Sequence, residues 1–207
     1  MSPRLPLKSL CFLCIAITAC KPKEARIVAD ASRALGTVVA EETLKLAGAN
    51  KRVITIVPDA SWGPASTVVR DFETDLKKRG LTIQQIAVNL GDPMSRDVGL
   101  KSQDFLSALA NSADAGAIVS FAGAPLLKTG DAANTPSHAP VLIIATAMLG
   151  NVQGLPGDRT QIARMLDSRV VQLAIIDGSD PSATESAKHD PIHDVFNESY
   201  RVLRAPN

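Results

Sequence analysis

The sequence predicts an α/β domain built on a doubly wound, mostly parallel sheet. Three observations support this prediction. Short runs of β-branched and aliphatic residues alternate with longer segments whose apolar residues recur every three or four positions. Apolar residues make up 45% of the 207-residue chain, which is typical of a chain that folds around a buried core. The length suits one domain.

Charge and aromatic content exclude nucleic acid as an expected partner. The formal net charge is only +1, which provides no electrostatic footprint for a phosphate backbone. Aromatic residues are 3% of the chain, so rings on which bases stack are scarce.

The N-terminus reads as a secretion signal. Arg4 and Lys8 precede the apolar run 10–19, which is too short to span a bilayer because that takes about 20 residues. The run leads into residues 17–20, Ile-Thr-Ala-Cys, which resemble the lipobox of bacterial lipoproteins. The resemblance implies that Cys20 receives a diacylglyceryl thioether and that signal peptidase II cuts before it. Two or three acyl chains would then anchor the protein to a membrane of the bacterial cell envelope.

This interpretation divides the chain into a signal peptide (1–19), a lipidated tether (20–24) and a single α/β domain (25–207). Cys20 is the only cysteine left after cleavage, and lipid caps it. No disulfide, zinc site or catalytic thiol is therefore expected in the domain. The alternative is an ordinary signal peptide or an uncleaved anchor, with Cys20 incidental.

The elements of the domain follow in order. Apolar residues at helical spacing predict a helix over 24–47, which ends before Gly48. A continuous β-branched run predicts a buried strand at 53–57. A second helix is predicted over 63–79 and a second strand over 82–88.

The same criteria predict the remaining elements. They are a helix at 100–110, strands at 117–121 and 141–145, a helix at 158–167, a strand at 170–176 and a last short helix at 194–203. Five strands that alternate with helices fit a three-layer, Rossmann-like sheet in the flavodoxin-like order 2-1-3-4-5.

Three segments carry a family resemblance: residues 59–64 after the first strand, the helix end at 77–81, and the helix and strand at 163–177. In them the chain resembles one lobe of the type I periplasmic-binding proteins, which include sugar-binding members. The resemblance covers residues 51–177. Proteins of that family have two lobes joined by hinge strands, whereas this chain has the length of one.

Ligands of open parallel sheets bind beyond the carboxyl ends of the strands, where the strand order reverses. That rule nominates Asp59, Ser61 and Trp62 after the first strand, and Phe121 and Gly123 after the third. Asp59 would accept hydrogen bonds from a sugar hydroxyl or an amine, Ser61 would donate to an anion, and Trp62 would stack on a ligand. The alternative is that Asp59 or Ser61 caps the following helix and Trp62 packs on the sheet edge.

Two other features have competing interpretations. Arg96, in a turn-rich loop, would hold a carboxylate or phosphate, or else is a solvated surface charge. His189 and His193 do not predict a metal site, because Pro191 between them excludes the helix that would bring both rings together. No cofactor is expected either, since the glycine-rich nucleotide fingerprints are absent from the sequence.

The function we expect from the sequence is that of a membrane-anchored bacterial envelope lipoprotein, with its domain on the extracytoplasmic side. The domain would be a noncatalytic module that binds a small polar ligand or another envelope protein. One alternative is an envelope hydrolase with its site on the strand-end loops. Another is a structural subunit that pairs with a second lobe.

Overall fold

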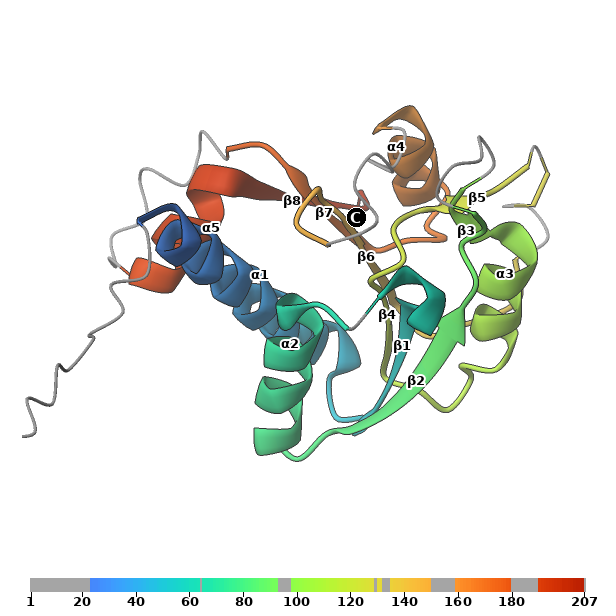
Figure 1. Ribbon diagram of the computed structural model, residues 1–207. Coiled ribbons are helices and arrows are strands. Elements are labelled where there is room, and N and C mark those ends of the chain that lie inside the picture. Colours follow the sequence, from blue (N-terminus) through green and yellow to red (C-terminus); the bar gives the residue numbers. More distant parts are fainter. Residues whose placement is uncertain are drawn as a thin grey trace, which may run out of the picture.

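The structure, a computed structural model, describes residues 23–63, 65–92, 98–128, 130–131, 135–149, 159–179 and 190–206. These residues form a three-layer α/β domain in which helices flank a central sheet (Figure 1), so the predicted fold class is confirmed. The predicted signal peptide, Cys20, Arg96 and His189 lie outside the described residues.

The central sheet has six strands in the order β2-β1-β4-β6-β7-β8. They are β1 (Arg52–Pro58), β2 (Thr82–Val88), β4 (Ala117–Ser120), β6 (Val141–Ala145), β7 (Leu173–Asp177) and β8 (Tyr200–Arg204). The first five are parallel to one another, and the predicted order 2-1-3-4-5 is the order in which they lie. β1 lies where the strand order reverses. Its Val53 is in register with Ile83 of β2 on one side and with Ala117 of β4 on the other.

The sixth strand corrects the prediction of five strands and of a helix over 194–203. The last helix, α5 (Pro191–Ser199), ends earlier, and the chain then runs antiparallel to β7 as β8. Tyr200 is in register with Asp177 and Val202 with Ile175. Strand pairing with β7 therefore overrides the helical spacing of the sequence, because the ladder satisfies the backbone groups of both strands.

The helices cover both faces of the sheet (Figure 1). α1 (Lys23–Ala47) packs against α2 (Thr67–Lys78) and α5 on one face. α3 (Ser102–Ala110) and α4 (Arg159–Asp167) lie on the other. A short parallel ribbon of β3 (Leu100–Lys101) and β5 (Pro125–Leu126) stands beside α3. None of the described helices combines the length and the apolarity that a membrane crossing requires.

The helix predicted over 63–79 is shorter than expected. A turn of 3₁₀ helix, η1 (Ala60–Trp62), follows β1, and α2 begins only at Thr67. The hydroxyl of Ser66 caps α2 by accepting a hydrogen bond from the N–H of Val69 at 3.3 Å. The chain between β1 and α2 is therefore a loop that can shape a site.

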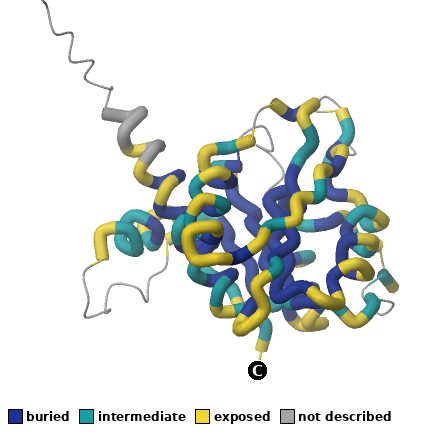
Figure 2. The backbone as a smooth tube through the Cα atoms, turned by 90° about the horizontal axis from the view of Figure 1, so that it is seen from below, coloured by how far each residue is buried: buried dark blue, intermediate teal, exposed yellow. Residues whose placement is uncertain are grey.

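Buried residues run through the middle of the domain (Figure 2). Their side chains form two hydrophobic cores, one on each face of the sheet. Alternation along β1 supplies both: Val53 and Val57 pack toward α1 and α2, and Ile54 and Ile56 pack toward α3. Because β1 is buried on both faces, its sequence is a nearly continuous apolar run and does not alternate between apolar and polar residues.

Candidate ligand-binding site

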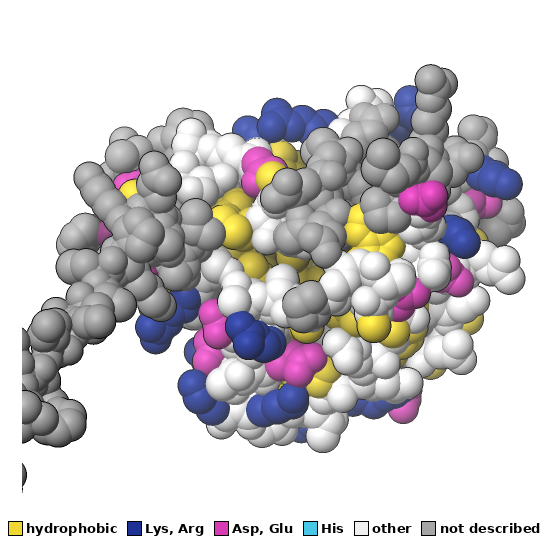
Figure 3. Space-filling view, in the orientation of Figure 1, with side chains coloured by type: hydrophobic (Ala, Val, Ile, Leu, Met, Phe, Trp, Pro, Cys, Tyr) yellow, Lys and Arg dark blue, Asp and Glu magenta, His cyan; other side chains and the backbone are white. Residues whose placement is uncertain are grey.

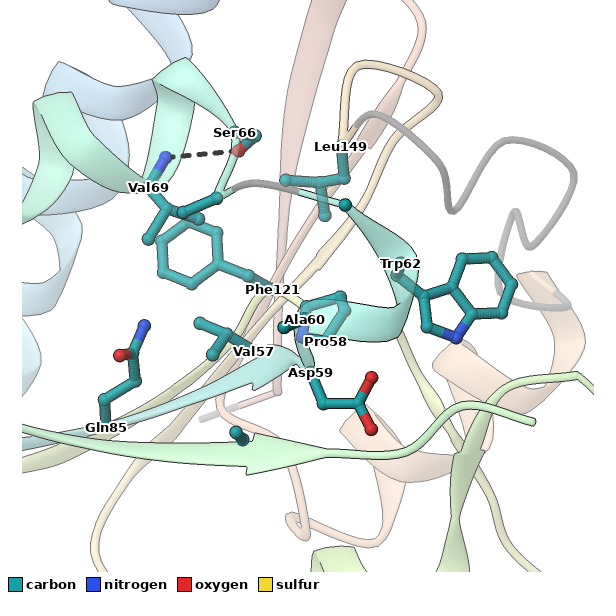
Figure 4. A pocket seen from close by; sticks show the side chains of 13 residues that line it. Val57, Pro58, Asp59, Ala60, Trp62, Ser66, Val69, Gln85, Phe121 and Leu149 are labelled. Atoms are coloured by element: carbon teal, nitrogen blue, oxygen red, sulfur yellow. Dashed lines mark hydrogen bonds between the residues drawn. The ribbon is translucent and has the colours of Figure 1, made fainter. Parts of the chain in front are cut away.

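A cavity of about 430 Å³ opens at the carboxyl end of β1, between η1, the start of α2 and β2 (Figure 4). Its walls are mainly apolar side chains, among them Val57, Val69, Ala87, Phe121 and Leu149. On the face shown in Figure 3, hydrophobic side chains occupy the hollowed middle, and Lys, Arg, Asp and Glu side chains lie around them.

The sheet topology explains why a cavity lies here. From β1 the chain runs through η1 and α2 to β2 on one side, while the strand on the other side, β4, is reached later. Connections that leave β1 and β4 therefore diverge, and the crevice between them is where ligands of such sheets bind. The structure brings three predicted site residues to this one cavity: Asp59, Trp62 and Phe121.

Asp59 follows β1 directly and supplies the one carboxylate among the described residues that line the cavity. Its Oδ1 accepts hydrogen bonds from the Ser61 hydroxyl and from the Ser61 N–H, the latter at 2.9 Å. These bonds, with a smaller contribution from the Asn89 side chain, hold the pKa of Asp59 below its ordinary value of 3.8 despite slight desolvation. Asp59 is therefore an ionised, acceptor-only group at neutral pH.

Ser61 positions Asp59 and does not line the cavity. Its exposed hydroxyl is hydrogen-bonded to that carboxylate, and Asp59 is the N-cap of η1. Asp59 thus does cap a helix, but the helix is the 3₁₀ turn η1, whereas Ser66 caps the long helix α2.

Trp62 is mostly buried, with 6% of the residue exposed. Its indole belongs to the core that includes Leu90 and Leu100, and in Figure 4 it points away from Phe121. Only a small part of the ring surface therefore meets the cavity, and the stacking face that the sequence suggested is packed inside the protein. This packing contributes to stability through burial of a large aromatic side chain.

Phe121 forms the inner wall of the cavity. It is 1% exposed, and its ring packs edge-to-face on Phe72 of α2, with the ring centroids 5.0 Å apart. Gly123 turns the chain just after β4 with a φ of 78°, a backbone conformation that favours glycine, and it does not line the cavity. The Ser120 hydroxyl donates a 2.8 Å hydrogen bond to the Gly123 carbonyl and so fixes this turn.

Sequence reasoning missed several cavity residues. Gln85 and Ala87 come from within β2, where the strand-end rule does not look. They are in register with Thr55 and Val57 of β1 and lie on the same face as these residues, but the sequence alone does not fix that register. Leu149 follows β6, and its position at a strand end was the available signal.

The described histidines lie apart from the cavity-lining residues. His193 lies between Asp190 and Glu41 on the α1–α5 side, and His138 Nδ1 lies 2.7 Å from the Ala139 carbonyl. Within the described ranges the Ser61 hydroxyl bonds to Asp59 and not to a histidine. In the same part of the chain, no group of three or more His, Cys, Asp or Glu side chains could hold a metal ion.

Among the described residues that line the cavity, no nucleophile is hydrogen-bonded to a base. Apolar walls accept a hydrocarbon portion, and the Asp59 carboxylate accepts hydrogen bonds from a hydroxyl or an amine. A scan against protein-family models and a search of curated proteins find no match for this chain. The properties of the cavity itself therefore carry the functional conclusion.

Proposed function

We propose that this protein is a bacterial envelope lipoprotein, anchored through Cys20, whose domain binds a small ligand in the cavity beyond β1. The observation that carries the ligand proposal is the cavity itself, which Asp59, Trp62 and Phe121 line together at the switch point of the sheet. Its volume of about 430 Å³ suits a small organic molecule, because such pockets typically measure about 300–1,000 Å³.

The charge of the lining defines the class of ligand. Asp59 is ionised, and no Lys, Arg or His is among the described residues that line the cavity. An anionic ligand would meet a carboxylate without a compensating cation, whereas an amine or a hydroxyl would find an acceptor. We therefore propose a neutral or cationic ligand with an apolar body and an amine or hydroxyl at one end.

Thermal unfolding of the purified full-length chain tests this proposal against a panel of amines, polyols and carboxylates. A ligand at a hundred times its Kd stabilises the native state by about 2.7 kcal/mol. That gain corresponds to a rise in Tm of roughly 5–10 °C for a domain of this size. We expect members of the amine or polyol classes to raise Tm and the carboxylates not to do so.

A pair of variants locates the effect. Ala87 is exposed on β2 and lines the cavity, so Ala87→Phe should fill it and abolish the Tm shift. Ala163 is exposed on α4 and does not line the cavity, so Ala163→Phe should leave the shift intact. A panel without any shift, or a shift that Ala87→Phe leaves unchanged, would overturn the proposal of this site.

Metabolic labelling with palmitate tests the anchor. The lipobox supports Cys20 as the modified residue, and Cys14 lies within the proposed signal peptide. Cys20→Ala should abolish label incorporation and release the chain from the membrane fraction, while Cys14→Ala should change neither. Label that persists in Cys20→Ala would refute lipidation at this residue.

A further inference from the structure

β2 forms one outer edge of the central sheet (Figure 1), and among the described residues its one strand partner is β1. It is unusually open, because four of its seven residues are exposed and only Val88 is buried. Exposed positions occur on both faces of the strand, since Gln84 and Gln85 are neighbours and both are exposed. The helices therefore leave the edge accessible.

The outward backbone groups of β2 follow from its bonds to β1. The Thr82 N–H donates to the Lys51 carbonyl at 2.8 Å, and the Val88 carbonyl accepts from the Asp59 N–H at 2.9 Å. Even-numbered residues thus direct their backbone groups toward β1. Alternation along the strand then directs the N–H and C=O groups of Ile83, Gln85 and Ala87 away from the sheet.

The residues of β2 itself lack the features that usually prevent strand addition. The seven residues of β2, Thr-Ile-Gln-Gln-Ile-Ala-Val, contain no charged residue and no proline. The opposite edge differs: β8 is five residues long and carries Arg201 and Arg204. Arg52 of β1, which bonds to Gln84, is paired with Asp114 and so does not leave an uncompensated charge beside β2.

We infer that β2 pairs with β2 of a second copy of this chain, antiparallel and about a two-fold axis at Gln85. Gln85 is the central residue of the strand, so this register pairs all seven residues and opposes Ile83 to Ala87 of the second copy. The outward-facing residues become the hydrogen-bonded pairs and exchange about six backbone hydrogen bonds.

The strand is a suitable partner for itself. An uncharged strand meets no like-charge repulsion when it faces its own copy, and each large Ile83 faces a small Ala87. At the axis the Gln85 amides can donate to and accept from each other. Because Ala87 lines the cavity, Ile83 of the second copy would lie at the cavity rim.

The symmetry is also compatible with the proposed anchor, although the pairing does not depend on it. A two-fold axis that relates antiparallel edge strands runs perpendicular to the sheet and keeps the same face on the same side. Both copies of α1, which lead from the N-terminus, therefore lie on one side of the joined sheet. Two lipid anchors on one side can enter one membrane.

Sedimentation of the full-length chain in detergent solution tests the inference through a pair of charge variants. Gln85→Lys and Gln85→Glu each place like charges across the two-fold axis, and each should raise the dimer dissociation constant at least about tenfold. An equimolar mixture of the two should restore the dimer, because opposite charges then meet at the axis. Gln103→Lys, at an exposed glutamine of α3, should dimerise like the parent chain.

A parent chain that stays monomeric at all concentrations would overturn the inference, and so would Gln85 variants that dimerise normally. A mixture that fails to dimerise, although both variants melt like the parent, would refute the pairing at Gln85. Mass distributions are measured without ligand. Failure of the dimer is therefore distinguishable from failure of the cavity to bind.

Discussion

At the residue scale, the proposed ligand class depends on the charge of Asp59. Hydrogen bonds from Ser61 keep its pKa below 3.8, so its charge is constant over the neutral range. Asp59→Asn keeps the size of the side chain and removes the charge. We expect this variant to weaken amine binding at least about tenfold, the usual cost of losing a hydrogen bond to a charged group. The Tm shifts produced by neutral hydroxyl ligands should change much less.

The pH dependence of amine binding follows from the same residue. A carboxyl whose pKa is depressed stays ionised as pH falls, until the pH passes through its folded-state value. Amine binding to the parent chain should therefore be constant from neutral pH down to about pH 4 and should decline below it. A decline already between pH 7 and pH 5 would show that another group controls binding.

Phe121 lines the cavity and also stabilises the domain. It is 1% exposed and packs on Phe72, so Phe121→Ala removes a fully buried ring and leaves a void. Denaturant unfolding should show a loss of about 3–5 kcal/mol in the free energy of unfolding. Leu126→Ala, at a leucine that is 46% exposed, is the control and should cost less than about 1 kcal/mol.

Among the elements, α1 and α2 depend on Gly36 for their close approach. A Cβ atom at this position would lie 2.9 Å from the Val68 carbonyl oxygen and 3.1 Å from Asp71 Cβ. Alanine is normally better than glycine in a helix by about 1 kcal/mol. Gly36→Ala should nevertheless destabilise the domain, by about 1–3 kcal/mol, because it forces the helices apart.

Chemical denaturation of Gly36→Ala measures this effect. Ser107→Ala, at an exposed position of α3, is the matched control and should be neutral or slightly stabilising. A Gly36→Ala variant that is more stable than the parent would show that the helices are not held at this separation.

α5 is tied to α1 by His193. Its Nε2 lies 3.0 Å from Glu41 of α1, and its Nδ1 lies 2.9 Å from Asp190. Burial disfavours the charged imidazolium, but the hydrogen bond to Asp190 and the charges of both carboxylates outweigh it. The pKa of His193 is thus raised above 6.5.

A raised histidine pKa predicts the direction of the pH effect on stability. The stabilisation is complete below about pH 6.5 and is lost as pH rises through the folded-state pKa. Denaturation of the parent and of His193→Gln from pH 5 to pH 9 should therefore give a stability difference that shrinks toward high pH. A difference that grows with pH would contradict the bridge.

The sequence predicted the elements of this fold well wherever local pattern and tertiary contacts agree. The bounds of β2 and β6 are those expected, because strands of a parallel sheet are continuous apolar or alternating runs. The apolar spacing of β8 suits a helix as well as a strand, and only pairing with β7 decides between them. Trp62 lies in the loop after the first strand, as expected, and lines the cavity, but the direction of its indole depends on the core beneath it.

At the scale of the whole molecule, the switch in strand order creates the site. Segments that are distant in the sequence, from Asp59 to Leu149, converge on one cavity because β1, β4 and β6 are parallel neighbours. Sequence reasoning located this edge of the sheet, since strand order follows from the alternation of elements. It did not locate the walls that β2 supplies, because side-chain placement within a strand depends on register.

The central claim is that the cavity beyond β1 holds a small ligand. The most direct measurement begins with the full-length chain isolated from its native host. The chain is denatured, and the small molecules that it releases are identified by mass spectrometry. Ala87→Phe and Ala163→Phe are prepared in parallel. We expect the parent and Ala163→Phe to release a compound with an apolar body and an amine or hydroxyl, and Ala87→Phe to lack it. The same small-molecule profile from all three preparations would contradict the claim.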